Sequence, residues 1–256
     1  MNDRLDSPSL YMTWSEAPWD QAVCGFPVLQ ITDMEVKGAS ASEDILLFEA
    51  ERDRRGTGLV SCRLPHDRLH ESMLLEDRGF RFIEMVYRPE LELSRAGNRF
   101  GPEGLDVSLA ADDDMPTLLS IAGQAFRNER FRMDPRLNPA ISDLRYQNWV
   151  AGGRRHARQQ LHVIRDAARI VSFFIVELLA DGTCYWHLNA LAPDAQGQGY
   201  GRRVWSCMID LAQRMGARQV CSSIVARNVR VLGLYASLGF RYAPPSMTFH
   251  WIRPTP

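Results

Sequence analysis

The spacing of apolar residues along the first 95 positions predicts several short strands around one helix. Alternating or continuous apolar runs favour strands at 26–32, 44–51, 58–64 and 80–87. Between the last two, a helix is expected from about Asp67 to Arg78, and Gly79 is a natural residue to follow its C-terminus. The glycines and the proline in 94–104 then indicate a linker.

After the linker the pattern becomes a regular succession of strands and helices. Strands are expected at 105–109, 160–166, 170–179, 183–191, 220–225 and 242–252. Helices are expected at 115–126, around Tyr146 and Trp149 up to Gly153, after a glycine-rich loop up to Gly216, and at 229–238. An arginine-rich polar loop, 127–138, separates the first two helices. This order of elements predicts an α/β (α+β) fold.

Composition narrows the class of protein without indicating its activity. With 45% hydrophobic and 24% charged residues, the 256-residue chain has the composition of a soluble globular protein of one large or two modest domains. A net charge of −1 gives no reason to expect nucleic acid or a membrane surface as a partner. No apolar run approaches ~20 residues, and the N-terminus lacks a signal-peptide core, so we expect a cytoplasmic protein.

The cysteines and histidines point to no metal or disulfide chemistry. The five cysteines are widely spaced among apolar neighbours and form no C-x-x-C pair, which favours buried thiols in a reducing compartment. The six histidines show no metal-ligand spacing, so no metal is expected. Lys37 is the only lysine, and arginine therefore carries nearly all of the positive charge.

Residues 188–203 combine an apolar strand, a proline, three closely spaced glycines and the start of an amphipathic helix. Such glycines let the backbone turn tightly and direct several N–H groups at one ligand, and a helix N-terminus favours an anion such as a phosphate. The dinucleotide-binding fingerprint requires a glycine where this loop has Arg202, and the Gly-Lys-Ser/Thr triplet of a P-loop is absent. The loop instead has the spacing Gln196-x-x-Gly199-x-Gly201. A glycine-rich turn without a ligand is the alternative.

This spacing and the order of elements resemble the GNAT superfamily of acyl-CoA-dependent N-acyltransferases over roughly residues 104–256. The resemblance implies a mixed sheet in which the strand before the loop splays from the next strand and pairs with the pantetheine arm of acetyl-CoA. It also implies that the loop binds the pyrophosphate of this co-substrate. The implied acetyl-CoA contacts are Ala190, Leu191, Ala192, Gln196, Gly197, Gln198, Gly199, Tyr200, Gly201, Arg202, Arg203 and Asn228.

Acyl transfer from a thioester to an amine needs a proton donor for the departing thiolate, and Tyr235 is the candidate. A phenol with a pKa near 10 protonates an alkyl thiolate without being ionised at neutral pH. Asn228 lies seven residues earlier, two helical turns, so both side chains project from nearly one face. GNAT enzymes commonly show this pair followed by Gly-Phe, here Gly239-Phe240. The alternatives are that Asn228 only caps the helix and that Tyr235 is a core aromatic.

The general base is less clearly marked by the sequence. Where some GNAT enzymes place a glutamate, this chain has Ser223. On the strand that feeds the loop, His187 shares a face with Tyr185 and Asn189 by period two, and its pKa range suits a group that accepts a proton directly or through water. Glu177 is a weaker candidate, and a purely structural histidine is the alternative. An amine of modest pKa would need little help.

The first half resembles a partial copy of the second. Aligning Gly79-Phe80 with Gly239-Phe240 superposes a strand and a helix of the two halves, 60–64 on 220–224 and 67–78 on 227–238. The first copy has no Gln-x-x-Gly-x-Gly, and Leu75 stands at the position of Tyr235. If one half carries chemistry, it is therefore the second.

The arginine-rich segment carries a more specific resemblance. Its motifs are similar to those of bacterial TDP-fucosamine-type acetyltransferases, which modify the amino group of dTDP-linked 4-amino-4,6-dideoxy sugars: Arg130-Phe131, Asp134-Pro135 and Tyr146-x-x-Trp149. Guanidinium groups match phosphate oxygens bidentately, so a nucleotide diphosphate is the candidate ligand of Arg127, Arg130, Arg132 and Arg136. A solvated loop is the alternative, and Tyr146 and Trp149 are more typical of a core.

The sequence thus predicts a diverged, non-catalytic GNAT-like half at 1–95 and a catalytic GNAT acetyltransferase domain at 104–256. The predicted activity is acetyl-CoA-dependent N-acetyl transfer to a small-molecule primary amine, with a nucleotide-linked 4-amino sugar as the favoured acceptor. A protein N-terminus, a polyamine or another small amine is the alternative acceptor, and a non-enzymatic acyl-CoA-binding protein is the alternative class. The sequence is compatible with a homodimer.

Overall fold

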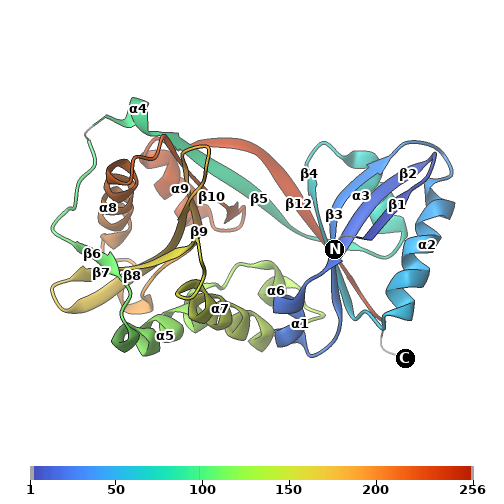
Figure 1. The fold of residues 1–256 in the computed structure, drawn as a ribbon, viewed down its shortest axis with the longest axis horizontal. Coiled ribbons are helices and arrows are strands. Elements are labelled where there is room, and N and C mark those ends of the chain that lie inside the picture. Colours follow the sequence, from blue (N-terminus) through green and yellow to red (C-terminus); the bar gives the residue numbers. More distant parts are fainter. Residues whose placement is uncertain (1–2, 98, 255–256) are drawn as a thin grey trace. The chain divides into compact units, whose positions relative to one another are not determined.

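The computed structural model describes residues 3–97 and 99–254, and the chain forms two compact units (Figure 1). Unit 1 comprises Met1–Val86, Arg130–Ile141 and Pro244–Pro256. Unit 2 comprises Tyr87–Glu129 and Ser142–Ala243. The units therefore do not coincide with a simple division into halves, because two segments from the second half of the sequence belong to unit 1.

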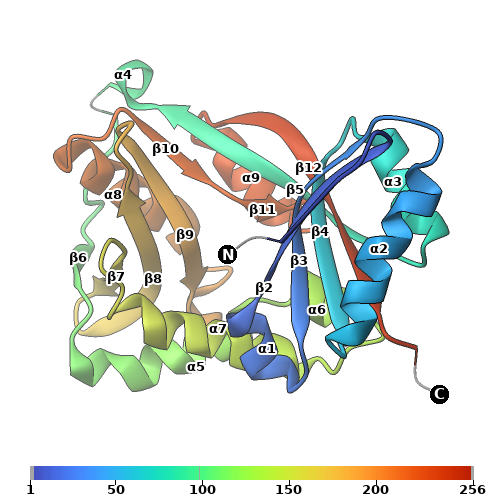
Figure 2. The same cartoon turned by 45° about the vertical axis from the view of Figure 1, so that its right-hand side comes forward.

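Unit 1 contains a sheet in the order β1-β2-β3-β4-β12, in which only the β3–β4 pair is parallel. Figure 2 shows α2 and α3 on the same side of these strands, and both helices contribute to one apolar core with Phe249 and Trp251 of β12. The elements are β1 (Asp3–Asp6), β2 (Leu10–Glu16), α1 (Pro18–Cys24), β3 (Val28–Val36), α2 (Ala41–Arg54), β4 (Leu59–Pro65), α3 (Leu69–Asp77), α6 (Arg130–Met133) and the end of β12 (Arg241–Ile252).

Unit 2 contains the order β5-β10-β9-β8-β7-β6, with β11 paired to β5. Phe174 of β8 meets Trp205 of α8 edge-on, at a centroid distance of 5.0 Å, whereas α7 places Gly153 against the neighbouring Ile175. Because successive strand residues face opposite ways, α7 and α8 cover opposite faces (Figure 1). The elements are the end of β5 (Arg81–Glu92), α4 (Leu93–Ala96), β6 (Asp106–Leu109), η1 (Asp112–Asp114), α5 (Met115–Ala125), α7 (Ala140–Gly153), β7 (Gln160–Asp166), β8 (Arg169–Leu178), β9 (Thr183–Leu191), η2 (Pro193–Ala195), α8 (Tyr200–Arg214), β10 (Gln219–Ser222), β11 (Ile224–Val225) and α9 (Val229–Ser237).

Most predicted elements of the second half are confirmed. In the first half, the strand predicted at 44–51 is wrong. This stretch lies in α2, where Ile45 and Phe48 are fully buried and the intervening Leu46 and Leu47 are exposed. A spacing of three residues between buried positions is helical, and the continuous apolar run concealed it. The predicted strand 220–225 is interrupted at Ser223, which separates β10 from β11.

The internal repeat is visible in the element boundaries. Helices α3 and α9 are nine residues each and begin 160 positions apart, at Leu69 and Val229. Strands β5 and β12 are 12 residues each with the same offset. The turns between them also match, because Phe80 N donates to Leu75 O and Phe240 N donates to Tyr235 O. The first half is thus a diverged structural copy of the second.

The two copies exchange their last strands. The end of β5, from the first copy, pairs with β10 in unit 2, and the end of β12, from the second copy, pairs with β4 in unit 1. The registers are equivalent, since Glu92 pairs with Gln219 and Ile252 pairs with Leu59. Each unit therefore depends on a strand from the other half of the sequence.

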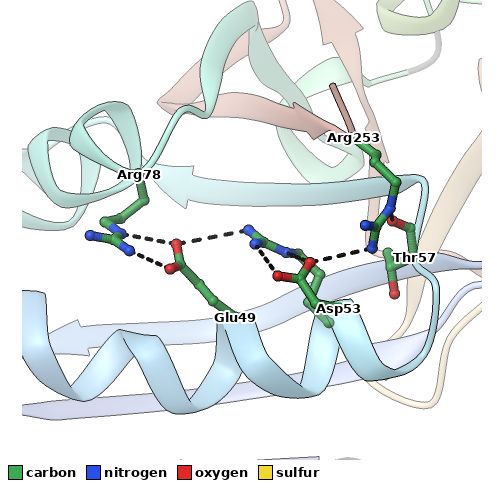
Figure 3. Close-up of polar contacts among 6 residues, drawn as sticks. Glu49, Asp53, Thr57, Arg78 and Arg253 are labelled. Carbon is green, nitrogen blue, oxygen red and sulfur yellow. Dashed lines mark hydrogen bonds and ion pairs between the residues drawn. The ribbon is translucent and has the colours of Figure 1, made fainter. Parts of the chain in front are cut away.

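A chain of charged side chains fixes the exchanged end of β12 to α2 in unit 1 (Figure 3). The Arg253 guanidinium lies 3.3 Å from Asp53 and donates from Nε to the carbonyl of Thr57 at 2.9 Å. Arg52 bonds the same aspartate at 3.0 Å, and its guanidinium lies 3.8 Å from the centroid of the Trp251 ring. The chain continues along the helix through Glu49 to Arg78 of α3.

Candidate active site

The parallel ladder between β9 and β10 opens at its C-terminal end. The last pair is Trp186 with Ser222, but β9 continues to Leu191 while paired only with β8. Among the described residues, no strand therefore covers the free edge of β9 at Ala190 and Leu191. This is the splay that the sequence predicted, and its unpaired backbone groups are available to an extended ligand.

A β-bulge lies at the point where the strands separate. Trp186 and Leu188 pair with adjacent residues of β8, so His187 is the extra residue between them. Bulges re-aim side chains and occur next to active sites. Unit 1 has the same irregularity, since its parallel ladder ends at Ile31 and Thr32 is the extra residue that follows.

His187 is held by a buried carboxylate on the neighbouring strand. Its Nε2 lies 2.9 Å from Oε2 of Glu177, and the other carboxylate oxygen lies 3.2 Å from Nε of Arg158. The Tyr185 ring meets the imidazole edge-on at 4.8 Å, and its hydroxyl is 2.7 Å from Ser223 Oγ. Burial lowers the pKa of His187 below its usual value, although Glu177 opposes the shift. The imidazole is therefore neutral at neutral pH, with Nε2–H donated to Glu177 and Nδ1 left as the basic nitrogen.

Tyr235 points from α9 into the core of unit 2, where it is 1% exposed. Burial raises the pKa of its phenol, while the polar side chains of Ser222 and Asn189 act in the opposite direction. Ser222 ends the ladder, and Asn189 is two residues beyond the bulge. The hydroxyl thus lies where β9 and β10 separate, and burial keeps it protonated.

The glycine loop has the backbone of an anion cradle. Gly197 and Gly199 adopt the left-handed region, with φ of 79° and 83°, and Gly199 is the N-cap of α8. A Cβ added at Gly199 would meet no atom within 4 Å, so the loop borders open space. Among the described residues, the N–H groups of 197–201 have no backbone acceptor outside α8. These features suit the pyrophosphate of acetyl-CoA.

The side chains around the loop are tied to one another. The Tyr200 hydroxyl donates to Asp166 at 2.7 Å, and Arg203 also contacts this carboxylate, at 3.4 Å. Gln198 donates to the carbonyl of Asp194, while Gln196 and Arg202 are exposed. The cradle itself is therefore made of backbone, with arginines at its border.

Asn228 occupies the N-cap position of α9, but its side chain makes no capping hydrogen bond. Its carbonyl accepts from the N–H groups of Val231 and Leu232. The alternative in which the Asn228 side chain caps the helix is therefore not seen, because Asn228 adopts φ of −84° and ψ of 59° rather than an extended N-cap conformation.

The four predicted phosphate-binding arginines fall in different units. Arg127 lies in unit 2, where it is exposed and bonds the carbonyl of Gln124, and the other three lie in unit 1. Arg130 pairs at 3.1 Å with Asp20, which is 1% exposed. Arg136 pairs through two nitrogens with the buried Asp134, which is also 3.0 Å from Nδ1 of His250. Arg132 is half-buried.

These pairings anchor the segment in unit 1. Its Phe131 and Leu137 complete an apolar cluster with Val28 and Leu59. Tyr146 is a core residue, as predicted; it is 8% exposed and stacks on Phe126 at 4.0 Å.

Sequence reasoning underestimated Glu177 and missed Arg158. No local pattern connects them to His187, because Glu177 is ten residues away along the chain and approaches through the β8–β9 register. The β-bulge at His187 could not be predicted from the sequence either, because apolar and polar residues continue to alternate through it.

Comparison with known proteins places this geometry in a family. The sequence model of the acetyltransferase (GNAT) family matches residues 123–240, which include the splayed strands, the glycine loop and Tyr235. Residues 123–240 form a GNAT acetyltransferase domain. The prediction of an N-acetyltransferase that uses acetyl-CoA as its co-substrate is thereby confirmed as the enzyme class.

Relatives of the GNAT domain differ in what their names say they act on. The chain is 20% identical to the spore coat polysaccharide biosynthesis protein SpsD of Bacillus subtilis, over 93% of this chain and 81% of that protein. It is 30% identical over 91 residues to the ribosomal protein bS18 alanine N-acetyltransferase of Escherichia coli, which covers 36% of this chain and 59% of the relative. A tandem GNAT protein from the clavulanic acid biosynthesis pathway has the same fold, with a TM-score of 0.62 and 11% identity over 97% of this chain and 80% of that protein.

Proposed function

We propose that this chain transfers the acetyl group of acetyl-CoA to the primary amine of a nucleotide-linked 4-amino sugar, at the site in unit 2. The observation that carries the proposal is the convergence of three features where β9 and β10 separate. These are an uncovered strand edge, a buried phenol that stays protonated, and a neutral imidazole held by a carboxylate. Acyl transfer to an amine uses all three.

The backbone of unit 2 fits acetyl-CoA. The free edge of β9 at Leu191 would hold the pantetheine arm, whereas the N–H of Ala192 donates to Val171 O and the carbonyl of Ala190 accepts from Ser172 Oγ, so both of these groups are already bonded to β8. The N–H groups of 197–201 would hold the pyrophosphate. Asn228 makes no capping bond and would contact the cofactor arm. When bound, acetyl-CoA supplies an activated thioester, and the chain supplies position and proton transfer.

His187 is the proposed general base. The neutral amine attacks the thioester carbonyl, and Nδ1 takes the proton from the nitrogen that becomes positively charged in this step, directly or through water. The carboxylate of Glu177 stabilises the imidazolium that forms. The buried carboxylate also fixes the tautomer, as in histidine–carboxylate pairs generally. Ser223, which stands where other GNAT enzymes have glutamate, is engaged with Tyr185 instead.

Tyr235 is the proposed general acid. Its phenol donates a proton to the departing sulfur, and the raised pKa keeps the donor protonated until that step. The position of its side chain is fixed by ring contacts with Trp205 at 6.1 Å and Phe240 at 4.7 Å.

Unit 1 is proposed to be non-catalytic. It retains the splay, but its β3–α2 connection is only 37–40 and has no glycine loop, and Leu75 replaces the phenol. The Glu71 carboxylate accepts a 2.9 Å hydrogen bond from the N–H of Val36, on the strand equivalent to β9. A carboxylate of the chain thus occupies an edge that in unit 2 is open.

The acceptor assignment is supported by the name of SpsD, a polysaccharide biosynthesis protein similar over nearly the whole chain, and by the arginine-rich segment. The similarity to the bS18 alanine N-acetyltransferase favours the alternative acceptor, a protein N-terminus, but it covers only about a third of the chain. The buried, free thiols of Cys62, Cys184, Cys207 and Cys221 support a reducing, cytoplasmic site of action.

The acceptor is tested by measuring release of free CoA from acetyl-CoA with three amines: a dTDP-linked 4-amino-4,6-dideoxy sugar, spermidine and a peptide with N-terminal alanine. We expect kcat/KM for the nucleotide sugar to exceed the others by at least ~100-fold. A preference for the peptide or spermidine would contradict the acceptor assignment. Binding of acetyl-CoA without transfer to any amine would contradict the proposal that the chain catalyses acetyl transfer.

A further inference from the structure

The loop between α7 and β7 concentrates positive charge. Its sequence over 154–159 is Arg-Arg-His-Ala-Arg-Gln, with three arginines, one histidine and no acidic residue. Arg154 is neutralised by Asp112, but Arg155 and Arg158 project from the exposed part of the loop. The loop is therefore a net cationic surface in unit 2.

Arg158 connects this loop directly to the candidate base. Its Nε is 3.2 Å from Oε1 of Glu177, whose Oε2 is 2.9 Å from Nε2 of His187. The carboxylate is 6% exposed, whereas the Arg158 side chain is 77% exposed. Glu177 therefore fixes Nε of the guanidinium, while most of the Arg158 side chain remains exposed to solvent.

His156 is oriented by the same loop. Its Nδ1 accepts the backbone N–H groups of Arg158 at 3.3 Å and Gln159 at 3.2 Å. In the neutral imidazole the proton is then on Nε2, which becomes a donor. Arg158 and His156 both contribute to the lowered pKa of His187, so both groups are close enough to act on the base electrostatically.

We propose that Arg158 and His156 bind a phosphate group of the acceptor while His187 faces its amine. This inference rests on the proposed function and names the substrate feature that the site selects. With His187 neutral, the charges of Glu177 and Arg158 cancel, and Arg155 leaves the surroundings positive. An anion is favoured there, and a polyamine is repelled.

The chemistry of these groups favours a phosphate. Terminal guanidinium nitrogens and an imidazole N–H present several donors to the oxygens of one tetrahedral group. Because one carboxylate separates the cation from the base, the acceptor must carry its phosphate within about one sugar ring of the amine. The predicted arginines Arg130 and Arg136 already have buried carboxylate partners in unit 1, whereas most of the Arg158 side chain remains exposed to solvent.

The test compares two acceptors that share one amine: a dTDP-linked 4-amino-4,6-dideoxy sugar and the methyl glycoside of the same amino sugar. Arg158→Gln should raise KM for the nucleotide sugar by at least ~10-fold, the loss expected for a hydrogen-bonded ion pair. KM for acetyl-CoA should be unchanged, and kcat/KM for the methyl glycoside should fall much less than kcat/KM for the nucleotide sugar, because this acceptor feels the loss of Arg158 only through Glu177 and His187. Arg154→Gln is the matched control, because it removes the same charge from the same loop, and it should leave both acceptors unaffected.

Three results would overturn the inference while leaving the proposed function in place. Equal kcat/KM of wild type for the two acceptors would show that no phosphate is recognised, while the proposed function would stand. An equal loss of kcat/KM with both acceptors in Arg158→Gln would show that Arg158 acts only through Glu177. Selective loss with amines that carry a carboxylate, and not with the nucleotide sugar, would refute the phosphate assignment. If wild type acetylates no amine, the proposed function fails and this inference fails with it.

Discussion

The chemistry of His187 is set by its neighbours. A lone histidine on a strand is usually structural, but here a bulge turns it out of the strand pairing and a buried glutamate holds one nitrogen. Burial lowers the pKa, so the imidazole is already neutral at pH values where a free histidine is partly charged. A neutral imidazole with one nitrogen anchored is prepared to accept a proton.

This arrangement predicts the pH dependence of turnover. If His187 is the base, as we propose, only its neutral form is active, and kcat/KM should fall as the pH drops through the lowered pKa, on the acid side of 6.5. His187→Gln should reduce kcat by about 100-fold and abolish this acidic limb, as measured in pH profiles of CoA release. Glu177→Gln should reduce kcat less, because the amide still accepts from Nε2 but carries no charge. An acidic limb that persists in His187→Gln would assign the base to another group.

Residues differed in how well the sequence predicted their place. The placement of Tyr235 and Asn228 on one helix could be predicted, because their spacing along the chain and from the glycine loop is visible in the sequence. His187 was named, but its partner Glu177 ranked lower, because strand register and bulges are not encoded in local spacing. The arginine cluster was grouped by proximity in sequence, and the fold commits Arg130 and Arg136 to buried carboxylates in unit 1.

Among the secondary-structure elements, the glycine loop and the splayed strands together form the proposed acetyl-CoA site. Gly199 has a positive φ, which favours glycine over other residues. A Cβ added at Gly199 would meet no atom within 4 Å, so the backbone there borders open space. A side chain there would fill the space that the pyrophosphate needs.

Gly199→Val should weaken acetyl-CoA binding by at least ~100-fold, measured by isothermal titration calorimetry. Gly216→Val is the matched control, because Gly216 has a φ of 77°, also has no atom within 4 Å of an added Cβ, and follows the other end of α8. Both variants carry the same backbone strain, so both should lose similar thermal stability. Equal loss of affinity in the two variants would refute the pyrophosphate assignment of the loop.

Elements with strong periodicity were predictable, and those that depend on tertiary context were not. The predicted bounds of β7 and β9 match the structure. In α2, four consecutive apolar residues gave no visible period, and only packing decides which two face the core. The N-terminal strands β1 and β2 were not predicted, because polar residues interrupt both.

At the scale of the whole molecule, exchanged strands make the two halves of the sequence interdependent. The repeat could be predicted from the Gly-Phe alignment, but the strand exchange could not. Glu92 pairs with Gln219, 127 residues away, and Leu59 pairs with Ile252, 193 residues away. Pairing over such separations leaves no signal in the local sequence. A linker at 94–104 therefore does not imply a boundary between independent domains.

A fragment of 104–256 should not fold by itself. It lacks β5, so β10 would present an uncovered edge, and the end of β12 would lack its β4 partner. We expect the fragment to be insoluble or to show no cooperative unfolding by circular dichroism, and co-expression with 1–103 to restore a soluble complex. A soluble fragment that unfolds cooperatively and binds acetyl-CoA would contradict this account.

The central claim is that unit 2 acetylates an amine with Tyr235 as the proton donor, and Tyr235→Phe tests it most directly. The measurement is acceptor-dependent CoA release by the wild type and the variant, with the Kd for acetyl-CoA determined in parallel. We expect kcat to fall at least ~10-fold while Kd is little changed, because only the hydroxyl is removed from a packed ring. An unchanged kcat, or a loss of acetyl-CoA affinity equal to the loss of rate, would contradict it.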